Sequence, residues 1–351
     1  MIGTSVALAL RECGRPVWLH DRDAESVRLA AGLGAGSPLL ADGAPAGPVD
    51  IAVLAVPPGA IAAELRAAQE RNLARCYTDV ASVKELPLRQ ARDLGCDLRS
   101  YVPGHPLSGR ERSGPAAARA DLFLGRPWVI CPLAENDADA IVLVTGLSAA
   151  CRAQPVQISV TEHDQWVALV SHAPHVVAAA MAARLEQAAP GALGLAGQGL
   201  RDTTRVAAGN PGMWLQILTG NAGPTSQVLR AVAADLQHAA TALDQVGAGD
   251  EQAVKELAEL LDRGSAGVAR IPGKRGGPAR DFAIVQVIIP DRPGELARLF
   301  QAADEAGINI EDVGIEHSPG LPVGVAELSV KPEAVAQLST ALAAGGWPVR
   351  R

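Results

Sequence analysis

Residues 1–21 read MIGTSVALALRECGRPVWLHD and decide how the first part of the chain is interpreted. The apolar spacing of residues 2–13 predicts a helix, and the short apolar run 16–20 predicts a buried strand that ends at Asp21. The next hundred residues repeat this helix-and-strand order. Helices are expected at 23–32, 60–71 and 83–94, and strands at 50–56, 74–80, 99–103 and 127–131. Strands that alternate with helices predict an α/β fold with a doubly wound, parallel, Rossmann-type sheet over residues 1–136.

Three further regions follow this sheet. Residues 137–262 are rich in Ala and Leu with broad apolar faces, which predicts an all-helical substrate and dimerisation domain and hence a homodimer. Residues 263–281 are rich in Gly, Pro, Arg and Lys, which predicts a linker. Residues 282–351 give a βαββα pattern ending in WPVRR, which predicts a ferredoxin-like module.

Composition narrows the class of protein. The 351 residues are 48% hydrophobic and 20% charged, with a net charge of −7, which argues against binding to nucleic acid or to anionic membranes. No apolar run was expected to reach the roughly 18 to 20 residues that span a bilayer. The five cysteines form no CxxC pair, so we expect a reducing cytoplasm and no disulfide framework.

The start of the chain matches the second part of a dinucleotide-binding fingerprint. Gly3 allows close packing of a helix on a strand, and Asp21 is placed to accept hydrogen bonds from ribose hydroxyls. Asp21 would favour NAD, whereas Arg22 keeps NADP open. The alternative is that Gly3 merely begins a helix and Asp21 caps the next one. Val56 and Pro57 follow a predicted strand, at the edge of the sheet where ligands bind.

Two polar residues follow later strands. Ser82, in TDVASVK (78–84), is either a ligand donor or the N-cap of the next helix. His105, in GHPLSG (104–109), is expected in a loop at a strand end. Its near-neutral pKa would make it a general base there, unless it is only a hydrogen-bonded loop histidine.

The helical region carries a second group of polar residues. His172 and His175 are three residues apart, but without HExxH or a nearby Cys they do not predict a metal site, and no metal is expected. Arg201 and Arg205 flank Asp202, so either arginine could bind a carboxylate or simply pair with Asp202.

Taken in order, eight segments resemble the prephenate dehydrogenase family over residues 1–280. They are IGTSVALAL, the strand ending at Asp21, VLAVPP, TDVASVK, GHPLSGRERSG, HDQWVALVSHAPH, RDTTRVAAGNPGMW and IPGKRG. The resemblance implies oxidative decarboxylation of prephenate to 4-hydroxyphenylpyruvate with hydride transfer to NAD in tyrosine biosynthesis. It also implies NAD contacts from the start of the chain and the strand ends: Ile2, Gly3, Asp21, Val56 and Pro57.

The same resemblance implies roles for residues around the substrate. His105 matches the catalytic histidine, and Ser82 a residue hydrogen-bonded near it. His175 matches a pocket residue, and Arg205 the arginine that binds the substrate carboxylate. The polar and gating positions at the pocket mouth are matched by Glu111, Asp164 and Trp214.

The family's first strand and Gly-x-Gly are missing before Met1, so we expect Met1 to be an internal methionine that was taken as a start. Three rival functions stay open: an arogenate dehydrogenase, a cyclohexadienyl dehydrogenase that accepts both substrates, and an inactive amino-acid sensor.

The segment DRPGELARLFQAADEAGINI (291–310) resembles an ACT domain, a small amino-acid-sensing module. The resemblance implies an amino-acid site at its turn and facing segment, with tyrosine as the feedback inhibitor. The residues concerned are Asp291, Pro293, Gly294 and Asn309.

Overall fold

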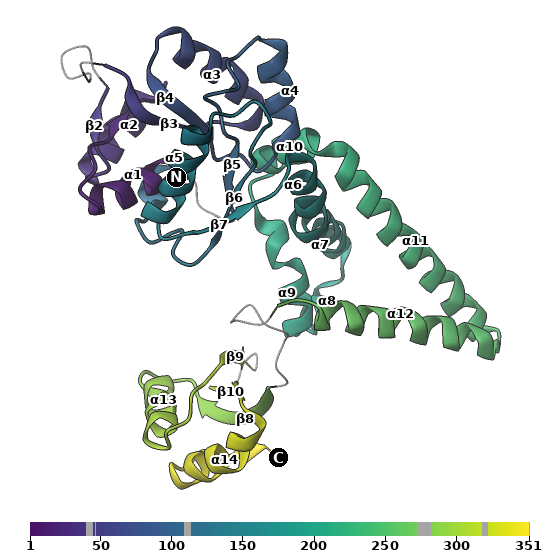
Figure 1. Ribbon diagram of the computed structural model, residues 1–351. Helices are drawn as coiled ribbons and strands as arrows, with labels where there is room; N and C mark the ends of the chain where they lie inside the picture. Colours follow the sequence, from purple (N-terminus) through teal and green to yellow (C-terminus); the bar gives the residue numbers. More distant parts are fainter. Residues whose placement is uncertain (40–44, 46, 109–113, 273–281, 318–321, 351) are drawn as a thin grey trace. The chain divides into compact units, whose positions relative to one another are not determined.

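The computed structural model describes residues 1–39, 45, 47–108, 114–272, 282–317 and 322–350 (Figure 1). The chain divides into two compact units, Met1–Ala234 and Asp235–Arg351, and each is described by itself.

The first unit begins with the predicted alternation of helices and strands. β1 pairs with β2 in parallel, and β3 pairs with β4 in parallel. The Asp23 side chain accepts hydrogen bonds from the backbone N–H groups of Glu25 and Ser26, so Asp23 and not Asp21 caps α2. The elements are α1 (Ile2–Glu12), β1 (Trp18–Leu19), α2 (Ala24–Gly32), β2 (Ser37–Pro38), β3 (Val49–Leu54), α3 (Ile61–Glu70), β4 (Ala74–Asp79) and α4 (Glu85–Asp93).

The prediction that every strand is parallel is wrong at β5. β5 (Gly104–Pro106) pairs antiparallel with β6 (Pro127–Ile130), and β7 (Gln154–Gln157) pairs parallel with β6. The described residues between β5 and β6 contain only a short 3-10 turn at Pro115–Ala117. Without a crossover helix the chain returns in the opposite direction.

The strand predicted at 99–103 is displaced along the chain. Within that range only Tyr101 makes a bridge, to Tyr77, and the strand itself is β5, which contains His105. His105 therefore lies in a buried strand and not in a loop.

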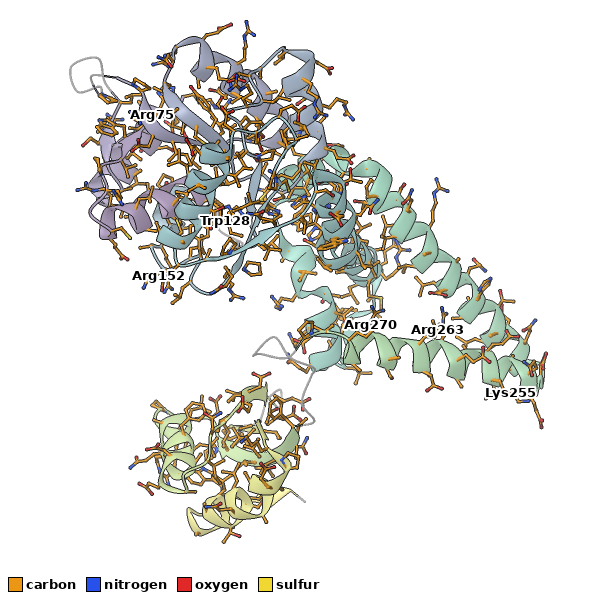
Figure 2. All side chains as sticks on the ribbon, in the orientation of Figure 1. Arg75, Trp128, Arg152, Lys255, Arg263 and Arg270 are labelled. Atoms are coloured by element: carbon orange, nitrogen blue, oxygen red, sulfur yellow. The ribbon has the colours of Figure 1, made fainter. Side chains whose placement is uncertain are left out.

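One hydrophobic cluster of the α/β layers extends beyond the predicted boundary at residue 136. Trp128 of β6, in the interior of this part of the molecule (Figure 2), is fully buried with Val6 of α1 and Cys76 of β4. Val144 of α5 (Ala138–Ala150) belongs to the same cluster. Because α5 packs in this core and β7 pairs with β6, the α/β packing continues to Gln157.

Helices make up the next part of the chain. Ser159 begins the first of them with a capping box, in which its side chain accepts from the Glu162 N–H while the Glu162 carboxylate accepts from the Ser159 N–H. A π-helical turn, Ala168–His172, follows without a break in the helix. The helices are α6 (Val160–Val167), α7 (Ala173–Ala183), α8 (Pro190–Leu193), α9 (Gln198–Arg205), α10 (Pro211–Gly220), α11 (Ala222–Gly247) and α12 (Glu251–Ala269).

α12 continues into the predicted linker, so residues 263–269 are helical. Apolar residues recur every seven positions at Val254, Leu261 and Val268, a spacing that keeps one helical face apolar to the end. The Arg263 guanidinium, labelled in Figure 2, lies 2.8 Å from the Asp235 carboxylate of α11.

One helical stretch, Val160–Gln187, is long and apolar enough by length and composition to cross a membrane, with a mean hydropathy of 1.4 in its most apolar window. This finding corrects the expectation that no apolar run reaches the length needed to span a bilayer. Its first turns carry His163 and Asp164, which are buried and hydrogen-bonded to the α/β part, so these turns belong to the interior of the first unit.

The C-terminal module is a four-stranded antiparallel sheet with strand order β11-β8-β10-β9 and two helices. This βαββαβ order is ferredoxin-like, as predicted, with the additional strand β11 at the chain end. The second strand of the module, β9, begins at Asp312. The elements are β8 (Ala283–Pro290), α13 (Glu295–Glu305), β9 (Asp312–His317), β10 (Val323–Val330), α14 (Val335–Ala344) and β11 (Val349–Arg350).

The core of this module generates a stability prediction. Leu328 of β10 is fully buried, so Leu328→Ala removes packed methyl groups and should lower the free energy of opening of the module by about 2–5 kcal/mol. Ile284 on the adjacent β8 is 58% exposed, so Ile284→Ala should change it by less than about 0.5 kcal/mol. Hydrogen exchange of the β8 and β10 amides measures the free energy of opening in both variants. An equal loss in Leu328→Ala and Ile284→Ala would contradict the assigned core.

Candidate active site

A buried ion pair shapes the loop after β4. The Lys84 ammonium pairs with Asp79 Oδ1, and both side chains are fully buried. The Ala81 N–H donates to Asp79 Oδ1 at 2.8 Å, and the Tyr101 hydroxyl donates to Oδ2 at 2.7 Å. The Asp79 carboxylate is thus surrounded by donors, as a buried charge requires. These contacts fix the path of the chain from β4 into α4.

Asp164 joins the start of α4 to α6. Its Oδ1 accepts the Lys84 N–H and its Oδ2 the Glu85 N–H, each at 2.9 Å. The side chain is 1% exposed, so the expectation that Asp164 lies at a pocket mouth is wrong. Two N–H groups at a helix start, which have no partner within the helix, attract a carboxylate and explain why it is buried there.

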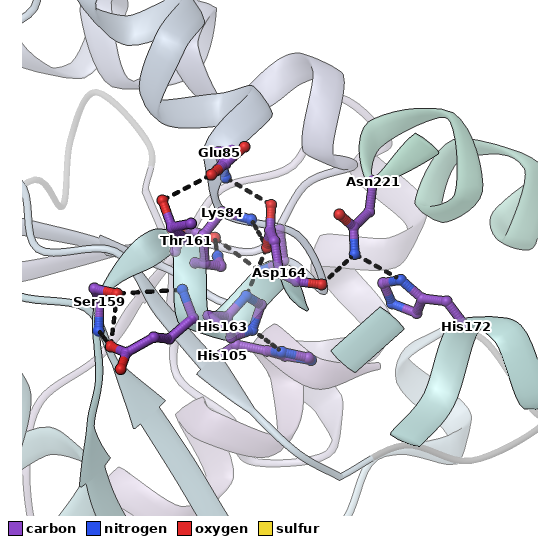
Figure 3. A network of polar contacts seen from close by, with 12 residues as sticks. Lys84, Glu85, His105, Ser159, Thr161, His163, Asp164, His172 and Asn221 are labelled. Carbon is purple, nitrogen blue, oxygen red and sulfur yellow. Dashed lines mark hydrogen bonds and ion pairs between the residues drawn. The ribbon is translucent and has the colours of Figure 1, made fainter. Parts of the chain in front are cut away.

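His105 and His163 form a pair beside Asp164 (Figure 3). The two imidazoles are joined by a hydrogen bond of 2.8 Å between His105 Nδ1 and His163 Nε2. His163 Nδ1 lies 2.7 Å from Asp164 Oδ1. The three side chains therefore form a continuous chain from β5 to α6.

Burial lowers the pKa of the His105 imidazole well below its usual range, and His163 and Lys84 lower it further. The expected near-neutral pKa is therefore wrong. His105 is a neutral imidazole at physiological pH, able to accept a proton only through whichever ring nitrogen carries no hydrogen.

The π-helical turn carries a second group of rings toward this chain. His172 Nδ1 accepts from Asn221 Nδ2 at 3.1 Å, and the same amide donates to the Asp164 backbone carbonyl at 2.7 Å (Figure 3). Burial lowers the pKa of His172 to about 4. Single π turns inside α-helices are frequent at functional sites.

His175 and Trp214, both predicted site residues, are in contact. Their rings are stacked with centroids 3.6 Å apart and 10° between the planes. A Cβ on Gly209 would lie 2.5 Å from Trp214 Nε1, so only glycine allows the indole to take this position. His172 meets the same indole edge-on, with centroids 6.3 Å apart, which links these rings to the Asn221 amide.

Arg205 is exposed at the end of α9, which packs against α7. No ion pair of Arg201 or Arg205 is found among the residues that the structure describes, and Asp202 instead accepts from the Gln198 amide at 2.8 Å. The alternative that an arginine here pairs with Asp202 is therefore wrong. Within the part of the chain that the structure describes, the Arg205 guanidinium is therefore available for an anion.

Two further predicted residues have different outcomes. Ser82 is half-buried, and within the described part of the chain its hydroxyl makes no hydrogen bond. The N-cap of α4 is Lys84, so the capping alternative for Ser82 is wrong. Glu111 lies outside the described residues.

The start of α1 has the features of a nucleotide site. A Cβ on Gly3 would lie 2.7 Å from the Ala55 Cβ, just beyond β3, so glycine is required for this close approach. No side chain caps the helix. Asp21 is exposed. Burial lowers the pKa of the Met1 amino group, and the nearby Asp21 charge opposes this with a smaller effect.

Three other residues are predicted to contact the cofactor. Ile2 is half-buried in α1, and Val56 and Pro57 follow β3. Across the residues described, no group of three or more His, Cys, Asp or Glu side chains is arranged to hold a metal ion.

In the C-terminal module the predicted ligand residues lie on the surface. Asp291 and Pro293 are exposed, and Gly294 begins α13 with a φ of +91°, which favours glycine. Asn309 donates to Glu311 at 2.7 Å. None of these four lines the cavity of about 280 Å³ found in this module.

That cavity has a buried carboxylate at its base. Glu295 accepts from Arg292, Arg298 and Trp347 Nε1, and all four residues line the cavity. None of these four residues was predicted from the sequence as part of a site.

Some residues of the first site were missed as well. No role was predicted from the sequence for Asp79, Lys84 or His163, nor for Asn221. The available signal was their place in TDVASVK and HDQW, where charged residues stand inside apolar stretches.

A Rossmann-type sheet joined to a helical domain, with a buried histidine where the two meet, defines a nucleotide-dependent dehydrogenase of two-domain build. The family model described as "Prephenate dehydrogenase, nucleotide-binding domain" matches residues 6–157, and "Prephenate dehydrogenase, dimerization domain" matches residues 159–263. A probable prephenate dehydrogenase of Streptomyces niveus is 39% identical over 99% of this chain and 96% of its own. The chain belongs to the prephenate dehydrogenase family.

Solved structures agree with this assignment. Prephenate dehydrogenase of Aquifex aeolicus, in complex with hydroxyphenyl propionate and NAD⁺, is 25% identical with a TM-score of 0.64, covering 76% of this chain and 94% of that one. Synechocystis arogenate dehydrogenase is also 25% identical, with a TM-score of 0.61, covering 76% and 95%.

Gly104 gives a prediction for the position of His105. A Cβ there would lie 2.9 Å from Thr78 Oγ1 and 3.0 Å from the Asp79 carbonyl, so Gly104→Ala must displace β5. We expect a loss of about 1–3 kcal/mol in the free energy of unfolding and, because His105 moves, a loss of about 10²-fold in turnover.

The control is Gly146→Ala in α5, where the added Cβ meets open space and stability should stay equal or rise. Denaturant unfolding and steady-state kinetics measure both variants. Wild-type turnover in Gly104→Ala would show that the position of His105 does not depend on this contact.

Proposed function

We propose that the protein catalyses the oxidative decarboxylation of prephenate to 4-hydroxyphenylpyruvate with NAD⁺ as the oxidant, in tyrosine biosynthesis. The observation that carries this proposal is the neutral, buried His105 imidazole, bonded through Nδ1 to His163. No hydrogen bond to its Nε2 is found among the described residues, which leaves that nitrogen for a substrate hydroxyl. Membership of the prephenate dehydrogenase family supports the choice of substrate.

His105 takes the proton of the ring hydroxyl of prephenate, and the carbon that bears this hydroxyl becomes a carbonyl carbon. NAD⁺ supplies the acceptor for the hydride that leaves the same carbon. When the ring carboxylate departs as CO₂, the electrons of the broken C–C bond make the ring aromatic and reach the former carbonyl oxygen. His105 can then return its proton to that oxygen, so the residue ends as it began. Aromatisation drives the reaction, and the protein mainly orients its reactants.

The helical residues bind the substrate in this proposal. The exposed Arg205 guanidinium holds a substrate carboxylate, and the stacked His175 and Trp214 rings line the pocket. Ser82, whose hydroxyl has no partner in the described part of the chain, hydrogen-bonds the substrate hydroxyl. Glu111 is assigned to the pocket mouth on the family resemblance alone.

NAD⁺ fits the start of α1. The close approach at Gly3 and the uncapped helix start are the features that dinucleotide sites use to bring backbone N–H groups to a pyrophosphate. Asp21 would accept from the ribose hydroxyls, and Ile2, Val56 and Pro57 would line the site. The nucleotide-binding family model supports this placement.

The second candidate is arogenate dehydrogenase or a cyclohexadienyl dehydrogenase that accepts both substrates, because the fold also resembles the Synechocystis arogenate enzyme. An inactive amino-acid sensor is the third candidate. A sensor that had lost catalysis would not need the catalytic residues. His105 and Arg205 are both present in this chain, and their presence favours an active enzyme.

A homodimer is also part of the proposal. The dimerization model matches residues 159–263, which include most of α12. Leu261 and Val268 on this helix are 71% and 68% exposed, and a second copy of the chain would cover such a face. We assign the cytoplasm as its compartment, since the five cysteines are free and the substrate is a small metabolite.

The function is tested by NADH formation with prephenate and, separately, with arogenate. Prephenate turnover is expected for the wild-type protein. Arg205→Ala removes a charged contact and should raise KM for prephenate about 10- to 100-fold. Arg201→Ala, exposed on the same helix, is the control and should leave KM unchanged. Turnover of arogenate but not prephenate would identify the protein as an arogenate dehydrogenase. If neither substrate is turned over, the inactive sensor is favoured.

We further propose that the C-terminal module is an ACT domain through which tyrosine inhibits the enzyme, by way of Asp291, Pro293, Gly294 and Asn309. Its ferredoxin-like topology supports this proposal.

Saturating tyrosine should lower turnover and raise the melting temperature of the full-length protein, because a ligand that binds only the native state stabilises it. Asp291→Ala should weaken both effects. The regulatory proposal is abandoned if tyrosine changes neither turnover nor melting temperature.

A further inference from the structure

His163 is a buried ionisable residue to which the proposed reaction assigns no role. It lies in the first turn of α6, and its side chain has no exposed surface. Its two ring nitrogens are both engaged, Nε2 with His105 Nδ1 at 2.8 Å and Nδ1 with Asp164 Oδ1 at 2.7 Å. The rings meet edge to face, with centroids 5.1 Å apart and 71° between the planes. Each imidazole can thus direct the hydrogen of the next.

The direction of these hydrogen bonds follows from Asp164. Both oxygens of its carboxylate already accept the N–H groups of Lys84 and Glu85, so the carboxylate serves as a hydrogen-bond acceptor (Figure 3). The hydrogen between Asp164 and His163 must therefore be on His163 Nδ1. The opposite arrangement would place a nitrogen lone pair 2.7 Å from a carboxylate oxygen in a buried site.

The state of His163 follows next. Burial lowers the pKa of the His163 imidazole, and Lys84 acts in the same direction, while Asp164 and Asp79 oppose them. A neutral imidazole with its hydrogen on Nδ1 has a lone pair on Nε2. That lone pair faces His105 Nδ1, which must therefore carry its own hydrogen.

We propose that His163, oriented by Asp164, is the positioning residue that holds the His105 hydrogen on Nδ1 and so keeps Nε2 as the proton acceptor for the substrate hydroxyl. His163 does not touch the substrate. The inference rests on the proposed function for its catalytic consequence, but the tautomer itself is a property of the protein without substrate.

The tautomer matters because His105 is neutral and buried. A surface histidine exchanges its hydrogen between the two ring nitrogens through water, whereas a buried one takes the tautomer that its partners impose. With the hydrogen on Nε2, His105 would present a donor to the substrate hydroxyl and could not remove its proton. Holding a catalytic imidazole in one tautomer by an acidic partner is an established device in hydrolases, where the wrong tautomer costs about 10⁴ in kcat.

The chain also serves His105 when it takes the proton. The imidazolium that forms keeps its Nδ1–H on His163, with the Asp164 charge one ring further away. The Lys84 ammonium, which disfavours positive charge on His105, is paired with Asp79, and His172 is the other titratable group that acts on His105. Asp164 acts on this chain through its hydrogen bond with His163 Nδ1.

The first test reads the tautomer directly. In the full-length protein labelled with ¹⁵N-histidine, NMR should show His105 protonated on Nδ1 and unprotonated on Nε2. His163→Phe removes the acceptor, and His105 should then populate the Nε2–H form. His172→Phe is the matched control, since His172 is also buried but bonds Asn221 and not His105, so the His105 signals should keep the wild-type tautomer.

The second test reads the consequence. His163→Phe should lower kcat for prephenate by about 10²- to 10⁴-fold. His163→Gln, which offers an amide oxygen to His105 and an N–H group to Asp164, should recover part of that loss and part of the Nδ1–H signal. A purely structural role would not distinguish Gln from Phe once both fold, as circular dichroism can verify.

Two results would overturn the proposal: an Nε2–H tautomer of His105 in the wild-type protein, or wild-type kcat in His163→Phe. If His163→Phe does not fold, the wild-type spectrum and His163→Gln still decide. If the wild-type protein turns over neither prephenate nor arogenate, the proposed function fails, and the NMR result alone tests the positioning role.

Discussion

The buried carboxylate of Asp164 is the constraint on which the site depends. A charge removed from water must be met by donors, and Asp164 meets two N–H groups at the start of α4 and the ring of His163. These donors come from the α/β layers and from α6, so one side chain joins the two parts of the first unit. The neighbouring Asp79–Lys84 pair fixes the loop that presents those N–H groups.

His105, the proton acceptor in our proposal, is held at this site by a strand. β5 is short and antiparallel to β6, and it holds His105 rigidly against His163. A site on a regular element is held more precisely than one on a loop, which suits a reaction in which orientation supplies most of the rate. The π-helical turn then brings His172 to the Asn221 amide, and the stacked His175 and Trp214 rings follow.

Local patterns predicted most of the elements. The alternation of helices and strands was visible from residue 2 to residue 131, as was the ferredoxin-like order at the end of the chain. Where the prediction was wrong, the deciding contact was distant in sequence. The direction of β5 depends on its pairing with β6, and the placement of α5 depends on the core around Trp128. The case of α12 is different, because the composition of residues 263–281 predicted a linker although the helix and its apolar face continue past residue 262.

The sequence by itself determined the class of fold, the residue types of the site and the family resemblance, because these rest on periodicity and on short segments in order. Only the tertiary structure decided the state of each group. It buried Asp164, lowered the pKa of His105, and paired His105 with His163 across 58 residues. Burial and hydrogen-bond partners set the charge and tautomer of an ionisable side chain, and both arise only when distant segments pack together.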